Sequence, residues 1–221
     1  MSVIEVLCGQ RTDEWFAERR GLLTSSCVAA IFMQGRAKNS ESTTKRDLRI
    51  RLALEDLTGR SQDGNDYRSP DMQYGVEREP DARLAYEAHV GVLVREVGFL
   101  RRDDLRIGSS PDAVIGRYEG GAEFKCPKTS THLEYIRTPG VPTDYLPQLR
   151  HHLLVTGAAW WDFVSFDDRL PEPLQLVVRR LLAKDADLAA HELAVRTFLT
   201  EVETEKAQIE ALASAAAGAA A

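Results

Sequence analysis

The sequence predicts a mixed α/β chain organised around one short hairpin. Two apolar runs at 108–115 and 122–126 flank a turn with two glycines, which is typical of paired strands. Segments 44–57 and 185–213 instead repeat apolar residues at helical spacing. At 221 residues the chain is long enough for one large core. We expect a single domain over 1–221, with its core at about 10–180 and a C-terminal helix with an alanine-rich tail at about 183–221.

The hairpin gathers charged side chains at one place. Alternate residues of a strand point to opposite faces, so Glu123 and Lys125 share a face. Asp112 opens the other strand of the hairpin. The pattern therefore predicts two carboxylates and one amine at the end of a small sheet, an arrangement that resembles that of the PD-(D/E)xK nucleases.

These residue types suit a divalent metal. Mg²⁺ prefers oxygen ligands, commonly one or two carboxylates with water and substrate phosphate. Asp112 and Glu123 can supply the carboxylates, and the main-chain carbonyl of Phe124 is a further candidate. Lys125 can orient an attacking water and stabilise charge on a phosphate. The alternative is an ordinary hairpin with solvated charges, since Glu-x-Lys triplets are common; the Ser110-Pro111-Asp112 run at hairpin distance favours the nuclease interpretation.

Composition excludes several other classes. The 43% hydrophobic and 28% charged residues describe an ordinary globular protein, and no apolar run approaches the roughly 20 residues of a membrane span. The first residues show no secretory signal pattern. The three cysteines, Cys8, Cys27 and Cys126, fit neither a disulfide framework nor a zinc or iron–sulfur site, so we expect a reducing compartment.

The net charge of −6 argues mildly against a nonspecific nucleic-acid coat. It does not exclude a nuclease, because an acidic metal site coexists with a local basic groove. Basic residues cluster at 36–51, a run more typical of a solvated helix face than of a DNA contact.

The N-terminal part predicts two helices. The first begins near Thr12 or Asp13 as N-cap and ends near Gly21. The second covers 27–32, with Ser25 or Ser26 as N-cap.

The same region offers an anion site. A helix N-terminus with hydroxyls and a nearby arginine can bind phosphate, which makes Arg19 and Ser26 candidates for a terminal phosphate. The alternative is that the serines only cap the helix and that Arg19 is exposed.

The middle of the chain alternates polar loops with helices. We expect loops at 34–44 and 60–71, the helix at 44–57, another helix around 82–89 and a strand at 92–100. Pro80 suits a first helical turn or kinks a longer helix. Glu79 immediately precedes Pro80. Its carboxylate either faces the metal site and holds a metal-bound water, or it is one of the acidic residues that are common at helix N-termini.

The second half predicts helices at 129–137 and 142–157, the latter capped by Gly157, and strands at 159–166 and 174–178. Gln148 can reach a phosphate or the attacking water from its helix. Adjacent helix positions face different ways, so His151 and His152 are interpreted as packing or surface residues rather than metal ligands. We expect the alanine-rich end to be frayed and assign it no function.

Several blocks in a fixed order resemble the phage lambda exonuclease family, also called YqaJ viral recombinases. The resemblance covers roughly 10–166 and implies a restriction-endonuclease-like core, a mixed central sheet flanked by helices. The blocks are Trp15, Arg19-x-Gly21-x-x-Thr24-x-Ser26, Gly75-x-x-x-Glu79-x-Asp81-Ala82-Arg83, Ser110-Pro111-Asp112, Glu123-x-Lys125-Cys126-Pro127 and Gln148 followed by Val155-Thr156-Gly157.

The resemblance also implies roles for individual residues. It implies that Asp112, Glu123 and the Phe124 carbonyl bind the metal and that Lys125 positions the nucleophilic water. Glu79 and Gln148 would assist that water or a second metal. Arg19 and Ser26 would form a pocket for the 5′-phosphate. The sequence departs from the family at Arg150. Two positions after the glutamine, the family often has a second polar residue, commonly Gln, so the role of Arg150 is open.

What the resemblance implies about activity is a Mg²⁺-dependent 5′→3′ exonuclease on duplex DNA that releases 5′-phosphomononucleotides and leaves 3′ overhangs for recombination. It implies two Mg²⁺ ions per site, with Mn²⁺ able to substitute. It further implies a ring-shaped homotrimer at double-stranded DNA ends, a single-strand annealing protein as partner, no membrane, and a phage or prophage origin in the cytoplasm of a bacterial host.

Two alternatives keep part of this picture. One is a PD-(D/E)xK endonuclease or junction resolvase; the other is a DNA-end-binding partner of an annealing protein without catalysis. Retention of Asp112, Glu123 and Lys125 argues against the second, and the scattered cysteines exclude a Cas4-like iron–sulfur nuclease.

Overall fold

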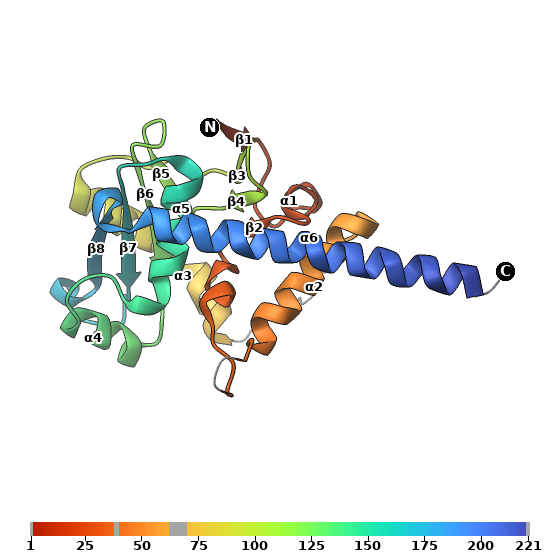
Figure 1. Ribbon diagram of the computed structural model, residues 1–221. Coiled ribbons are helices and arrows are strands. Elements are labelled where there is room, and N and C mark those ends of the chain that lie inside the picture. Colours follow the sequence, from red (N-terminus) through yellow and green to blue (C-terminus); the bar gives the residue numbers. More distant parts are fainter. Residues whose placement is uncertain (1, 38–39, 62–69, 220–221) are drawn as a thin grey trace.

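A computed structural model describes residues 2–37, 40–61 and 70–219 (Figure 1). Its strands form two four-stranded sheets, and both are mixed. The first sheet has the order β1 (Val3–Val6), β3 (Phe99–Arg102), β4 (Ile107–Ser109), β2 (Leu23–Thr24), and only β2 and β4 are parallel. The second has the order β5 (Ala113–Ile115), β6 (Gly120–Lys125), β7 (Trp160–Phe166), β8 (Leu176–Leu182), and only β6 and β7 are parallel. The predicted mixed α/β architecture is therefore confirmed, with its strands divided between two sheets.

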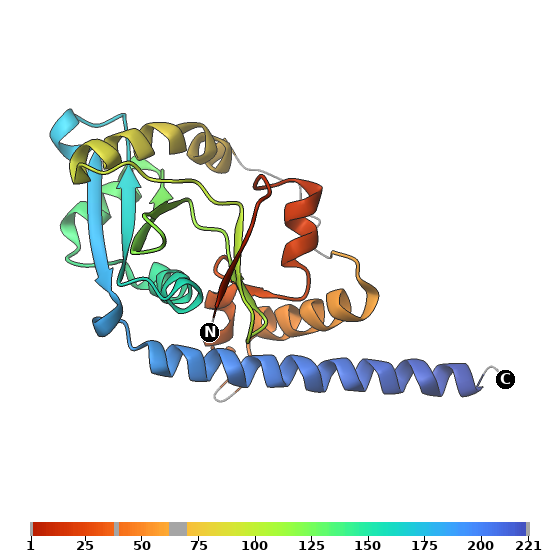
Figure 2. The same ribbon diagram turned by 90° about the horizontal axis from the view of Figure 1, so that it is seen from above.

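Helices cover both faces of the second sheet. Figure 2 shows α3 (Pro70–Val90) on one side of β7 and β8 and α5 (Leu146–Thr156) on the other. The alternation of β7 explains this arrangement, because Trp161 and Phe163 enter the core beneath α5 while Val164 and Phe166 join the cluster beneath α3.

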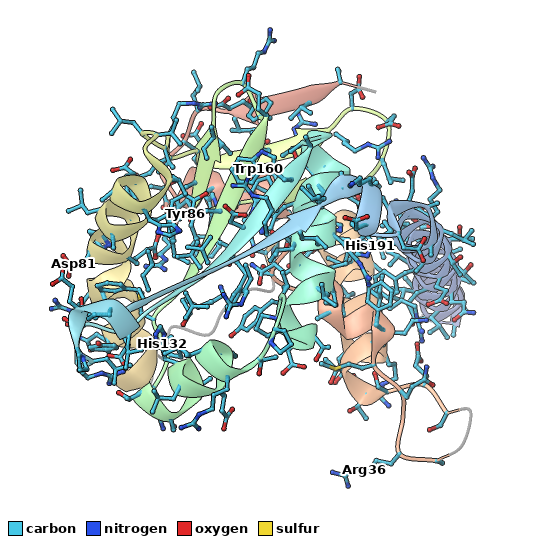
Figure 3. All side chains as sticks on the ribbon, turned by 90° about the vertical axis from the view of Figure 1, so that its left-hand side faces the viewer. Arg36, Asp81, Tyr86, His132, Trp160 and His191 are labelled. Carbon is cyan, nitrogen blue, oxygen red and sulfur yellow. The ribbon has the colours of Figure 1, made fainter. Side chains whose placement is uncertain are left out.

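Buried polar contacts fasten two helices to this sheet through Tyr86 and His132, which are labelled in Figure 3. From α3, the hydroxyl of Tyr86 donates to Asp162 over 2.8 Å. From α4 (Thr129–Arg137), which has the predicted bounds, His132 Nδ1 and the Ser165 hydroxyl lie 2.7 Å apart. Burial of these polar groups is tolerated because each has a partner.

The C-terminal helix α6 (Leu188–Ala219) is longer than predicted and crosses the whole molecule (Figure 1). Its first half buries Val195, Phe198 and Val202 against α2 (Thr43–Thr58) and α5. Figure 2 shows its last turns extending past the other elements, and residues 210–219 are exposed. The alanine-rich segment is helical as far as Ala219, so the predicted fraying there is not seen.

Several predicted helix ends are confirmed. Thr12 caps α1 (Asp13–Arg19) by accepting a hydrogen bond from the amide of Trp15. Gly59 ends α2 and Gly157 ends α5, and both adopt the left-handed conformation that glycine favours. A short 3-10 helix, η2 (Thr143–Tyr145), precedes α5.

The predicted caps at Ser25 and Ser26 are wrong. The second segment is a short 3-10 helix, η1 (Val28–Phe32), and its N-cap Cys27 makes no side-chain cap hydrogen bond. The hydroxyl of Ser26 is instead engaged by Arg19.

Two strand predictions also change. The strand expected at 92–100 begins only at Phe99, and before it Arg95 makes an isolated bridge with Val114. Gly120 and Gly121 lie in β6 rather than in the turn. They are needed there because an added Cβ would lie 2.2 Å from the Trp160 ring or 2.4 Å from the Trp161 ring.

The remaining segments need brief mention. Helix α3 begins at Pro70 and contains Pro80 in its interior, so the predicted helix around 82–89 is the second half of a longer one. Of the two predicted polar loops, residues 38–39 and 62–69 lie outside the described residues. Two 3-10 turns, η3 (Glu172–Leu174) and η4 (Ala183–Asp185), flank β8. Within the described part of the chain, no helix has the length and apolar character to span a membrane.

Candidate active site

The hairpin of β5 and β6 places Asp112 beside the strand that carries Glu123. The two strands pair with Ala113 opposite Ala122. Just beyond this pair, Asp112 Oδ2 accepts a 2.7 Å hydrogen bond from the amide of Phe124. The amide and carbonyl of one strand residue point to the same side, so the Phe124 carbonyl also faces the Asp112 side of β6.

Glu123 is the centre of a hydrogen-bond cluster. Its Oε1 accepts from Lys125 Nζ and from Gln148 Nε2, both over 2.5 Å. Its Oε2 lies 3.0 Å from His152 Nε2. The predicted common face of Glu123 and Lys125 is confirmed, and α5 brings Gln148 to the same carboxylate.

The surroundings shift the pKa values of Glu123 and Asp112 in opposite directions. Burial raises the pKa of Glu123, but the charge of Lys125 and the hydrogen bond from His152 outweigh it and lower the pKa to about 2. Burial and the charge of Glu123 raise the pKa of Asp112 well above its usual value. Glu123 is thus firmly ionised, whereas ionising Asp112 beside it is costly without a further positive charge.

Lys125 remains charged and reachable. Burial lowers its pKa, but the charges of Glu123 and Asp112 raise it by more. Of its side-chain surface, 27% is exposed, so Lys125 is only partly covered by the protein.

Glu79 approaches the cluster from α3. It lines a cavity of about 480 Å³ together with Asp112, Arg11 and Arg83. Burial raises the pKa of Glu79, the charge of Arg11 lowers it, and that of Glu123 raises it. The structure therefore brings Glu79 towards Asp112 and Glu123. This agrees with the interpretation that Glu79 faces the metal site, rather than with charge decoration of a helix N-terminus.

Arg11 is a cavity residue that sequence reasoning missed. Its φ of 67° is left-handed, which is uncommon for a residue other than glycine. The neighbouring Gln10 fastens this turn, because its amide donates to the carbonyls of Val97 and Pro111 over 3.0 and 3.1 Å. No local pattern in the sequence signals this conformation.

Arg19 and Ser26 lie together in a polar cluster, at the place where the sequence suggests a phosphate pocket. The Arg19 guanidinium donates to the hydroxyls of Ser26, Thr24 and Ser110 over 3.1, 3.3 and 3.2 Å, and it lies 3.9 Å above the ring of Trp15. A guanidinium among hydroxyls suits a phosphate group. The pocket reaches the hairpin directly, because Ser110 is two residues before Asp112.

The two adjacent histidines point in different directions, as predicted. Both are fully buried, so the expectation that they could be surface residues is wrong. His151 meets the Leu23 carbonyl at 3.1 Å, whereas His152 meets Glu123. The contact of His152 with Glu123 was missed, since a two-residue His run does not reveal which ring faces a site.

Arg150 lies on the side of α5 away from Glu123. Burial, with the charge of Arg150, lowers the pKa of His191 to about 4. Gln148 and His152 both contact Glu123, and Arg150, two residues from each of them on the same helix, faces the other way.

The cluster fits a hard divalent cation. Among the described residues there is no group of three or more His, Cys, Asp and Glu side chains arranged around a metal position. Mg²⁺ does not require one, since two carboxylates, a carbonyl, water and phosphate oxygens complete its shell. The raised pKa of Asp112 beside the ionised Glu123 is the electrostatic condition that a bound cation relieves.

Known structures share this fold, and one of these proteins is also similar in sequence. The chain is 36% identical to an alkaline exonuclease (LHK-Exo) from Laribacter hongkongensis, with a TM-score of 0.79 over 92% of this chain and 98% of that one. The structure of LHK-Exo in complex with dAMP matches equally well. A phage-related exonuclease from Haemophilus somnus 129PT shares the fold, with 15% identity and a TM-score of 0.59 over 86% of this chain and 95% of that one.

Two comparisons of the sequence gave different outcomes. No curated protein matches the chain, but a protein-family model does. Residues 14–159, which include the hairpin, Glu79, Gln148 and the Arg19 pocket, match the family described as the YqaJ-like viral recombinase domain. The chain belongs to this family.

Proposed function

We propose that this chain is a Mg²⁺-dependent exonuclease that degrades the 5′-ended strand of duplex DNA and leaves a 3′ overhang. The observation that carries the proposal is the hydrogen bond between Arg19 and Ser110, because it joins the guanidinium of the proposed phosphate pocket to the segment that leads into Asp112. The similarity to an alkaline exonuclease over nearly the whole chain supports the reaction class.

The carboxylates would hold the metal. Asp112, Glu123 and the Phe124 carbonyl are the proposed ligands, with Glu79 and Gln148 serving water or a second ion. When bound, two Mg²⁺ ions, or Mn²⁺ in their place, lower the pKa of water and neutralise charge on the phosphate.

Lys125 and Gln148 would act on the reacting groups. In the structure both donate to Glu123 Oε1, so both are already aimed at one point of the cluster. Lys125 would orient the attacking water and stabilise charge on the scissile phosphate, and Gln148 would hold the water or a phosphate oxygen.

The proposed polarity follows from the position of the pocket. Two residues of extended chain span at most about 7 Å. If Arg19 and Ser26 hold a terminal 5′-phosphate, the next phosphodiester lies on the scale of one nucleotide away, towards Asp112. Hydrolysis there releases a 5′-phosphomononucleotide and leaves a new 5′-phosphate for the next cycle.

We also propose a working assembly and partner. No described feature encircles DNA within one chain, so processive degradation would need a ring, for which a homotrimer is the proposal. A single-strand annealing protein would receive the 3′ overhang in recombination of phage or prophage type, inside a bacterial host. Light scattering tests the assembly, and a mass of one chain under reaction conditions would contradict it.

Digestion of linear duplex DNA labelled at either the 5′ or the 3′ end tests the reaction. We expect early release of 5′-labelled mononucleotide, slow loss of the 3′ label, and no reaction after chelation of Mg²⁺. Covalently closed circular duplex is the control and should remain intact. Cutting of the circle would indicate an endonuclease, and early release of the 3′ label would reverse the proposed polarity.

A further inference from the structure

His152 forms a fully buried bridge to the proposed metal ligand Glu123. Both ring nitrogens have partners: Nε2 lies 3.0 Å from Glu123 Oε2, and Nδ1 lies 2.6 Å from the Ser109 hydroxyl. The ring stacks on Trp161 with centroids 4.6 Å apart and planes 10° apart. His152 and Ser109 have no exposed surface, so neither can touch DNA directly.

The chemistry of the partners fixes the orientation of the bridge. An ionised carboxylate only accepts hydrogen bonds, so Nε2 is the donor to Glu123. Ser109 occupies the opposite nitrogen, and the indole of Trp161 holds the plane of the ring. A ring held at both nitrogens and on one face has one orientation towards Glu123.

The His152 contact gives the two carboxylate oxygens of Glu123 different partners. Oε2 is held by His152, whereas Oε1 is the oxygen that Lys125 and Gln148 share. Ser109 is the last residue of β4, and the run 110–112 that carries Asp112 follows it directly. His152 therefore ties both β6, which carries Glu123, and the end of β4, just before Asp112, to α5.

We propose that Ser109 and His152 form a positioning pair that holds Glu123 with Oε1 presented to the divalent ion. The inference rests on the proposed metal-dependent function. Groups that hydrogen-bond to a metal ligand orient it, and their loss commonly lowers metal affinity or activity about 10–100-fold.

A buried Ser–His contact can also be only structural, and the protein contains such a case. His132 meets the Ser165 hydroxyl at 2.7 Å and the Leu174 carbonyl at 2.9 Å, and neither partner is a carboxylate. His152 differs because its other partner is the ionised side chain at the centre of the site.

Three variants separate positioning from packing. His152→Phe keeps a ring against Trp161 but removes both hydrogen bonds. His152→Gln keeps an amide that can donate to Glu123. His151→Phe is the matched control, because His151 is the adjacent buried histidine on α5 and faces Leu23 instead.

The measurement is Mn²⁺ binding to the DNA-free protein by electron paramagnetic resonance, together with the Mg²⁺ concentration that half-saturates cleavage. We expect His152→Phe to weaken Mn²⁺ binding about tenfold or more and to raise the Mg²⁺ requirement in proportion, with KM for DNA ends unchanged. His152→Gln should recover most of the loss, and His151→Phe should bind Mn²⁺ as the wild type does.

Unchanged Mn²⁺ binding in His152→Phe, or equal weakening in His151→Phe, would overturn the inference. If His152→Phe does not fold, Ser109→Ala replaces it, with weaker Mn²⁺ binding expected and unchanged binding contradictory. If the wild type cleaves no DNA but binds Mn²⁺ more tightly than His152→Phe does, the proposed function is overturned and the positioning role of His152 stands. Normal cleavage and Mn²⁺ binding in every folded variant would overturn the positioning role alone.

Discussion

Lys125 donates a 2.5 Å hydrogen bond to Glu123, two residues earlier on the same strand. The contact joins the most firmly ionised acid of the site to a lysine whose pKa is raised by that acid. A strand is the element that allows this, because residues two apart share one face. The contact with Glu123 thereby holds the ammonium charge of Lys125 beside the proposed metal position.

Replacing Lys125 by Ala should abolish cleavage while sparing DNA binding. The ammonium group is proposed to stabilise charge that develops in the reaction, and loss of such a donor commonly costs about 10²–10³ in rate. Digestion rates and fluorescence anisotropy with labelled duplex measure the two properties. Lys184→Ala, which removes an exposed lysine in η4, is the control. Wild-type turnover by Lys125→Ala would contradict its role.

Replacing Arg19 by Ala should remove the preference for 5′-phosphorylated ends. The guanidinium donates to the hydroxyls of Ser26, Thr24 and Ser110 and supplies the positive charge of this group. A charge-assisted hydrogen bond is worth about 1.5–3 kcal/mol, so a preference of roughly tenfold or more should disappear. Comparison of phosphorylated and hydroxyl ends checks this.

Arg20→Ala is the matched control for the pocket, since Arg20 is the next residue but bonds to the carbonyls of Ala17 and Gly59. It should keep the preference for phosphorylated ends. A wild type that digests both kinds of end equally well would remove the pocket from the account.

Asp56 should make the junction of α2 and α6 sensitive to acid. Burial raises its pKa, but hydrogen bonds from Lys206 and Arg106 outweigh burial and lower the pKa below its usual value of 3.8. A lowered folded pKa stabilises the fold above the unfolded pKa, and the stabilisation is lost as the pH falls through the folded pKa. Asp56→Asn should therefore be less stable than the wild type at pH 7, by about 1 kcal/mol or about 2–4 °C, and the difference should shrink as the pH falls below 3.8.

Thermal melting from pH 3 to 7 measures this difference, and Asp47→Asn is the control. Asp47 lies on the same helix, but 64% of its side chain is exposed. A stability difference for Asp56→Asn that stays constant down to pH 3 would exclude the charge of Asp56 as its cause.

Replacing Gly121 by Ala should destabilise the fold. An added Cβ would lie 2.4 Å from the Trp161 ring and 2.8 Å from the carbonyl of Ala113. Overpacking of this kind costs about 1–3 kcal/mol, or several degrees of melting temperature. Gly218→Ala is the control, because nothing lies within 4 Å of its added Cβ. An unchanged melting temperature in Gly121→Ala would show that the sheet can yield there.

The hairpin was predictable because it depends on local rules. The alternation that puts Glu123 and Lys125 on one face was confirmed, and Asp112 does lie beside β6. The expected strand at 108–115 was wrong, because that run is divided between β4 and β5 of different sheets, with Asp112 just before β5. Helix ends at Gly59 and Gly157 were predictable for the same reason, since each needs a left-handed residue at a defined place.

The rest depended on contacts between distant segments. Gly120 and Gly121 locally predict a turn, but they lie in β6, where the indoles of Trp160 and Trp161 leave no room for a Cβ. His152 lies on α5, and its partner Glu123 lies on β6, 29 residues earlier. Neither the burial of His152 nor this contact could therefore be inferred from neighbours in the sequence. The division of the strands into two sheets is likewise a tertiary property.

Single-turnover cleavage of a 5′-phosphorylated duplex by the wild type and Asp112→Asn, across a Mg²⁺ titration, tests the central claim most directly. Asn can still accept from the Phe124 amide, so the fold should survive while one proposed ligand loses its charge. The account predicts Mg²⁺-dependent release of 5′-mononucleotides by the wild type and no release by Asp112→Asn at any Mg²⁺ concentration. Equal rates for the two proteins, or wild-type cleavage that survives chelation, would contradict it.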